Sequence, residues 1–139
     1  MAQTRFSGPV ASDNGFVGSV TGNITGNLSG NVTGNVTGNL TGITFGTVAT
    51  RSGAGAVPIT AATVQLTTTA ADALTLANGT NGQMLAIVMV VDGGDGTLTP
   101  TTKTGYSTIT FTAVGNSVLL QYFTTLGWMI ISNNGATVA

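Results

Sequence analysis

A glycine occupies every fourth position from Gly18 to Gly46, and this regular spacing constrains the fold more than any other feature of the sequence. An apolar residue stands two positions before each glycine until the last interval, where Thr44 takes its place. These apolar residues are Phe16, Val20, Ile24, Leu28, Val32, Val36 and Leu40. Because alternate side chains of an extended chain point to opposite faces, one face carries aliphatic residues and glycine, and the other carries Thr, Ser and Asn. The pattern predicts β structure over residues 16–46.

The apolar face of this repeat is too thin to form a core by itself. A helix is unfavourable, because each glycine in a helix costs about 1 kcal/mol relative to alanine. A repeat unit that cannot bury its own face must stack on neighbouring units or on other chains. We therefore expect an extended β stalk in which three copies of the chain intertwine, with the seven apolar residues packed between subunits. A narrow solenoid made by one chain and a flexible linker are the alternatives, and the strict apolar register argues against the linker.

The chain of 139 residues carries few charges and lacks the residues that most active sites use. It has three basic and four acidic residues, with no His and no Cys. The commonest general base, thiolate metal ligands and disulfides are therefore excluded. There is no basic surface for nucleic acid, and the longest apolar run, residues 84–91, is too short to span a bilayer. We expect a non-enzymatic protein with no catalytic residues, cofactor, metal, nucleic-acid partner or membrane partner.

The chain on either side of the repeat divides into three further parts. Residues 1–15 have no core of their own and predict an N-terminal arm, in which Arg5 and Phe6 are candidate anchors on a partner. A partly ordered terminus is the alternative interpretation. Residues 47–58 are rich in Gly and Ala and end at a proline, which predicts a hinge. Residues 59–139 show the alternating apolar residues and turn signals that are typical of a compact β domain.

This compact domain is expected to contain about six or seven short strands in a small sandwich or jelly-roll-like fold. Residues 83–91 predict a long strand that is buried, at least in part, on both faces. Pro100 is expected to confine the strand before it to a sheet edge. Residues 117–123 and 128–132, joined by a turn at 124–127, predict a β-hairpin. The fold class predicted for the chain is therefore all-β.

Two groups of side chains in the compact domain are candidates for binding. Asp92 and Asp95, in a DGGDG segment, are candidate calcium ligands, but their spacing lacks the alternating acidic pattern of a calcium loop, and a hairpin turn is favoured. Tyr106 and Trp128 are candidates for a surface that binds glycan. Trp128 alternates with Ile130, however, which favours a place in the core or in a subunit interface. Hydroxyl nucleophiles need a base, and none is evident beside the many Ser and Thr residues.

The segments GNITGNLSGNVTGNVTGNLTG and GNSVLLQYFTTLGWMIISNNGATVA resemble parts of virion proteins of tailed bacteriophages. The first is similar to the GNVTGN tracts of phage fibres and capsid-surface proteins, and the second to the closing hairpin of such proteins. The resemblance implies a non-enzymatic, usually trimeric protein of the virion surface. Because the chain is short for a host-binding fibre, it is more similar to a capsid decoration or cement protein, which binds the major capsid protein. A short fibre or adhesin module that binds host-surface glycan is the alternative.

Overall fold

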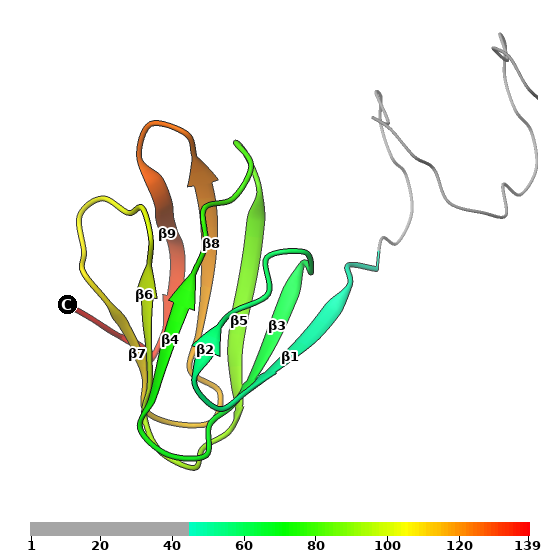
Figure 1. Ribbon diagram of the computed structural model, residues 1–139, viewed down its shortest axis with the longest axis vertical. Coiled ribbons are helices and arrows are strands. Elements are labelled where there is room, and N and C mark those ends of the chain that lie inside the picture. The colour runs from blue at the N-terminus through cyan, green and yellow to red at the C-terminus, as the bar shows by residue number, and fades with distance from the viewer. Residues whose placement is uncertain (1–44) are drawn as a thin grey trace, which may run out of the picture. The chain divides into compact units, whose positions relative to one another are not determined.

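The computed structural model describes residues 45–139, which belong to one compact unit, Thr41–Ala139 (Figure 1). The predicted arm with Arg5 and Phe6 lies outside the described residues. The seven apolar repeat positions from Phe16 to Leu40 lie outside them as well. The roles of the arm and of the repeat therefore stay predictions.

Ten strands form two five-stranded sheets, and the part of the chain that the structure describes contains no helix. Sheet A contains, in spatial order, β1 (Val48–Ser52), β3 (Thr63–Thr67), β5 (Met84–Val91), β8 (Ser117–Phe123) and β9 (Gly127–Asn134). Sheet B contains β10 (Thr137–Val138), β7 (Ile109–Phe111), β6 (Gly96–Pro100), β4 (Asp72–Leu76) and β2 (Gly55–Ala56). The prediction of an all-β fold is confirmed for this unit. With no helix in residues 45–139, none there could cross a membrane.

The chain passes back and forth between the two sheets for its first six strands. The neighbours β1, β3 and β5 pair in parallel in sheet A, and β2, β4 and β6 pair in parallel in sheet B. The pairs β1–β2, β3–β4 and β5–β6 thus form three stacked rungs, each with one strand in each sheet (Figure 1). Parallel neighbours need a long crossover connection, and here a strand of the opposite sheet supplies part of it. The four later strands pair with their neighbours antiparallel.

The core lies between the two sheets and is built from alternate residues of both. Its fully buried aliphatic and aromatic residues include Val64, Leu66, Leu85, Ile87, Met89, Leu120 and Trp128 from sheet A, with Leu74, Leu76, Leu98, Ile109 and Phe111 from sheet B. Burial of one such side chain stabilises the folded state by about 1.5–3 kcal/mol. The outward residues of β5 are mostly half-buried, so the prediction of a strand covered in part on both faces is confirmed.

The first rung occupies the segment that we predicted to be a hinge. Its interior is narrow, since β1 turns only Ala49 and Arg51 inward, and neither is fully buried. The Arg51 Nε donates a hydrogen bond to the Gly53 carbonyl at 3.2 Å. A Cβ on Gly55 of β2 would lie 2.6 Å from a terminal nitrogen of this guanidinium. The small residues therefore allow β1 and β2 to pack around the Arg51 side chain, and they do not serve to make the backbone flexible.

Two further local predictions can be compared with the structure. The hairpin is confirmed, because β8 and β9 pair antiparallel across the turn at residues 124–126. Pro100 does not place β6 at an edge, because β6 lies between β4 and β7. The short β7 pairs only with the segment Gly96–Leu98, so the missing N–H of Pro100 removes no hydrogen bond on that side.

Candidate functional site

Trp128 lies in the core, where the β8–β9 hairpin meets the loop between β6 and β7. The indole is fully buried, and its Nε1 donates a hydrogen bond to the Ala77 carbonyl at 2.8 Å. The Tyr122 ring packs edge-to-face against it, with ring centroids 5.3 Å apart. Such a ring has no free face for a sugar, so Trp128 does not fit the predicted glycan surface and takes the alternative, core role.

Tyr106, the second residue of that predicted surface, fastens the β6–β7 loop to sheet A. Its hydroxyl donates a hydrogen bond to the Trp128 carbonyl at 3.0 Å. The Thr102 carbonyl accepts a hydrogen bond from the Trp128 N–H at 2.9 Å, and the Thr104 hydroxyl donates to the Leu126 carbonyl at 2.9 Å. Tyr106 and Trp128 thus lie close together, but their hydrogen bonds join the β6–β7 loop to the β8–β9 hairpin.

Raising the pH above 10 is expected to destabilise the unit through Tyr106. Burial raises the pKa of Tyr106 from 10.0 to about 12, so the folded state holds its proton more tightly than the unfolded state. This contribution to stability is complete below pH 10 and is lost as the pH rises from 10 to 12. Urea unfolding at several pH values should show a steeper fall for the wild type than for Tyr106→Phe. Equal slopes for the two proteins would contradict the assignment.

Asp92 and Asp95 lie in the connection between β5 and β6, which crosses from sheet A to sheet B and is not the predicted hairpin. Both side chains are exposed. The Asp92 Oδ1 accepts a hydrogen bond from the Gly94 N–H at 3.1 Å, while Asp95 offers its backbone carbonyl to the Asp72 N–H at 2.8 Å. Within residues 45–139 no three His, Cys, Asp or Glu side chains are grouped so that they could hold a metal ion.

The glycines of this DGGDG segment are required by the stacking of the rungs. A Cβ on Gly93 would lie 2.5 Å from the Thr68 carbonyl oxygen, and one on Gly94 would lie 2.6 Å from the carbonyl carbon of Ala70. Thr68 and Ala70 belong to the turn between β3 and β4, which is the equivalent turn of the preceding rung. The segment is therefore a packing turn between two successive rungs.

Calcium at millimolar concentration is expected to leave the thermal unfolding midpoint unchanged. A ligand that binds only the folded state stabilises it by RT ln(1 + [L]/Kd), about 2.7 kcal/mol at a concentration of 100 Kd. Two exposed carboxylates that are grouped with no third acidic side chain within residues 45–139 are a weak basis for such a site. Thermal scans with calcium and with a chelator provide the measurement. A midpoint that rises with calcium in the wild type and not in Asp95→Asn would show that the turn binds the ion.

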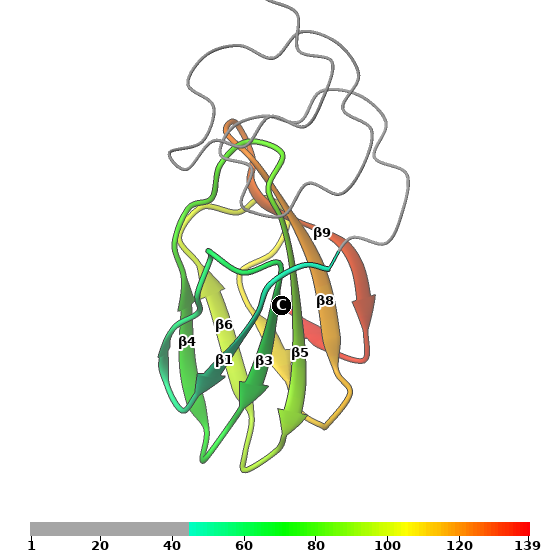
Figure 2. The same cartoon turned by 90° about the vertical axis from the view of Figure 1, so that its right-hand side faces the viewer.

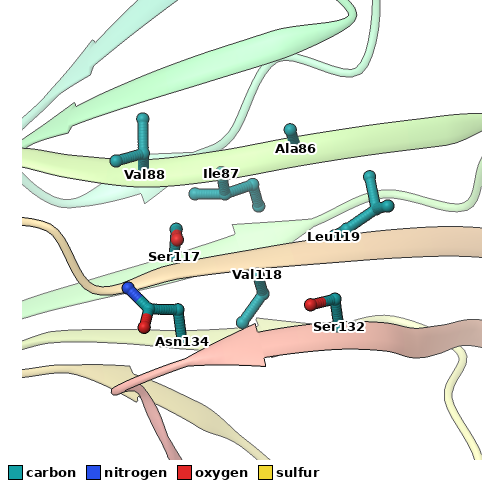
Figure 3. Close-up of a pocket in the computed structure, with 8 residues that line it drawn as sticks. All are labelled: Ala86, Ile87, Val88, Ser117, Val118, Leu119, Ser132 and Asn134. Carbon is teal, nitrogen blue, oxygen red and sulfur yellow. The ribbon is translucent and has the colours of Figure 1, made fainter.

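The outer face of sheet A is uncharged and is apolar at its centre; Figure 2 shows its strands side by side. Its outward apolar residues are Val48, Met84, Ala86, Val88, Val90, Val91, Leu119, Phe123, Met129 and Ile131. A hollow of about 290 Å³ lies over β5, β8 and β9 (Figure 3). The outward residues that line it are Ala86, Val88, Ser117, Leu119, Ser132 and Asn134.

The outer face of sheet B has a different composition. Its outward residues are Ala56, Ala73, Thr75, Thr97, Thr99, Thr110 and Thr137. Neighbouring hydroxyls of Thr97 and Thr110 lie 3.3 Å apart and share a hydrogen bond. Small hydroxyl side chains are readily hydrated, so this face is suited to contact with water. The outer face of sheet A, which is apolar at its centre, is instead suited to contact with another apolar surface.

The outer face of sheet A was not among the candidate sites named from the sequence, although a signal for it exists. A strand with one solvated face alternates apolar with polar residues. Residues 84–91 carry no polar side chain at all, whereas β4 places Ala73 and Thr75 outward. A strand that is apolar at every position is typical of a sheet in which both faces are covered, so this pattern predicts a contact on the outer face as well.

Function must be inferred from the chain itself. No known protein-family model matches the sequence, and no curated protein sequence matches it significantly.

Proposed function

We propose that the protein is a non-enzymatic virion structural protein, a homotrimeric decoration or cement protein on the capsid surface of a tailed bacteriophage. The observation that carries the proposal is the outer face of sheet A, which is uncharged and is apolar at its centre, because apolar patches on soluble proteins mark interaction sites. The resemblance of the repeat and of the closing hairpin to phage virion proteins supplies the class of protein. The compact unit would be a small β-sandwich, carried on a trimeric β stalk formed by residues 16–46.

In this role the protein strengthens the shell by bridging subunits of the major capsid protein. The arm, with Arg5 and Phe6, docks on the shell, and the apolar repeat residues join three chains. Three linked docking sites raise the overall affinity by about 10²–10⁴ over a single site, because the second and third contacts are intramolecular. Each contact has to break before neighbouring shell subunits separate under the pressure of packaged DNA.

The alternative function, a fibre or adhesin module that binds host glycan, receives less support. The two residues named for it, Tyr106 and Trp128, are engaged in hydrogen bonds within the protein, to the Trp128 carbonyl and to the Ala77 carbonyl. The outer face of sheet A carries Thr, Ser, Gln and Asn on β1, β3, β8 and β9, but its central strand β5 has no polar side chain that would orient a sugar. Ligand sites need precisely placed polar groups to confer specificity.

The copy number of the protein in purified virions tests the proposed function. Quantitative mass spectrometry should find hundreds of copies per particle, since a decoration protein repeats over the whole shell. A handful of copies would place the protein in the tail and support the fibre alternative. Absence from intact particles whose genome encodes the chain would overturn the virion role altogether.

A further inference from the structure

We propose that the outer face of sheet A is the surface through which the compact unit contacts further copies of the same chain. The proposal rests on the homotrimer of the proposed function and specifies which face of the unit lies between subunits. Hydrophobic burial is the main favourable term in most protein–protein association, and this face offers aliphatic side chains that are still accessible. Met84 and Ile131 are each 51% exposed, on β5 and β9.

The distribution of charge favours a second copy as the occupant. No outward side chain on the strands of sheet A is charged. The charged residues of the described unit lie elsewhere: Arg51 faces inward, Asp72 is buried, Asp92 and Asp95 lie in a turn, and Lys103 donates to the Pro100 carbonyl. Two copies of an uncharged face meet without like-charge repulsion. A charged partner surface, by contrast, would find no charge of opposite sign on this face.

The size of the face is sufficient for a specific contact. The five strands contain 33 residues, each of which covers about 3.3 Å along a strand and about 4.8 Å across it, so that the planar outline is roughly 500 Å². Side chains raise the accessible area above that of the outline. A stable interface buries about 800 Å² on each partner, so the whole face is of the order of one such interface.

The shape of the face offers two complementary features for a ring of copies. Ala86 and Ser117 are small and leave the floor of the hollow open (Figure 3). On β9 the register shifts between the partners of Leu119 and Leu120, and the extra residue is Ile131, which is half exposed. A cyclic trimer uses two different patches of each subunit, so a raised side chain and a hollow on one face can engage different neighbours.

Thiol labelling of the full chain tests the proposal, because the natural sequence contains no cysteine. Ser132→Cys places a thiol on the proposed surface, and Thr99→Cys places a matched thiol on the outer face of sheet B; both positions are exposed in the single chain. In the assembled protein the Cys at position 132 should react at least tenfold more slowly with a thiol reagent than the Cys at position 99. In denaturant both should react at the same rate. Equal rates in the assembled protein would overturn the proposal.

A second pair of variants measures the strength of the contact. Leu119→Asp buries a charge in the proposed surface and should raise the dissociation constant of the assembly by about 100-fold, whereas Thr99→Asp should leave it unchanged. Light scattering over a dilution series gives both values, with circular dichroism to establish that each variant is folded. If Leu119→Asp assembles as tightly as Thr99→Asp, the proposal is wrong.

The mass of the wild-type chain separates this proposal from the proposed function. A mass of three times 13.8 kDa together with equal thiol rates means that the homotrimer stands and the sheet A surface does not. A mass of 13.8 kDa at every concentration means that the homotrimer itself fails, and the sheet A surface fails with it. If the protein is a trimer with a protected thiol at position 132 but is absent from virions, the sheet A surface is supported and the capsid role is wrong.

Discussion

Replacing Gly127 with alanine is expected to destabilise the compact unit by about 2–5 kcal/mol, the sum of backbone strain and overpacking. Gly127 has a φ of 76°, in the left-handed region that disfavours side chains. A Cβ there would also overlap the carbonyl group of Thr102. That carbonyl belongs to the backbone and accepts the hydrogen bond from the Trp128 N–H, so it cannot move without loosening the β6–β7 loop.

Gly115→Ala is the matched control for this variant. Gly115 has a φ of 90°, but an added Cβ would meet no other atom within 4 Å, so only the backbone strain of about 1–2 kcal/mol should appear. Urea unfolding followed by the fluorescence of the single tryptophan gives both free energies. A Gly127→Ala variant no less stable than Gly115→Ala would mean that the loop does not pack on Gly127 as described.

Replacing Trp128 with alanine is expected to lower the free energy of unfolding by about 3–5 kcal/mol, because a large buried ring is removed and a cavity remains. Trp128→Phe should lower the free energy of unfolding by less, since it keeps a ring beside Tyr122. It loses the hydrogen bond to the Ala77 carbonyl, which contributes about 1 kcal/mol. Urea unfolding followed by circular dichroism compares the variants, which lack the natural fluorophore. A loss below 1 kcal/mol for Trp128→Ala would place the ring at the surface and revive the glycan alternative.

Much of the strand content could be predicted from the sequence, because alternation of side chains is a local property. The hairpin of β8 and β9 and the long strand β5 follow from alternation and turn residues alone. The alternation of Trp128 with Ile130 indicates a place in the core or in a subunit interface, and the structure places the ring in the core. Strand pairing is not local: nothing in the residues of β3 states that its neighbours are β1 and β5 and that both run parallel to it.

Three predictions failed or stayed incomplete because one local sequence pattern can serve more than one structural purpose. Pro100 was assigned to an edge because proline lacks an N–H, but the cost vanishes where the neighbouring strand is too short to need it. The Gly/Ala segment 47–58 suggested a hinge, although small residues also permit close packing, as at Gly55. The DGGDG turn suggested a hairpin, although its glycines serve contact with the preceding rung. The deciding contact of the DGGDG turn comes from residues far away in the sequence, Thr68 and Ala70, whereas Gly55 packs on Arg51 within its own segment.

The stacking of rungs also has a mechanical consequence for a protein whose chain continues ahead of residue 45. β1 and β2 each pair with one strand only, and the first rung contributes little buried surface. A tensile load entering through residue 45 acts on β1 before it reaches any other strand. The first rung is then expected to peel away while β5, which has partners on both sides, keeps the core closed. The unit would therefore lengthen in a step before its core opens.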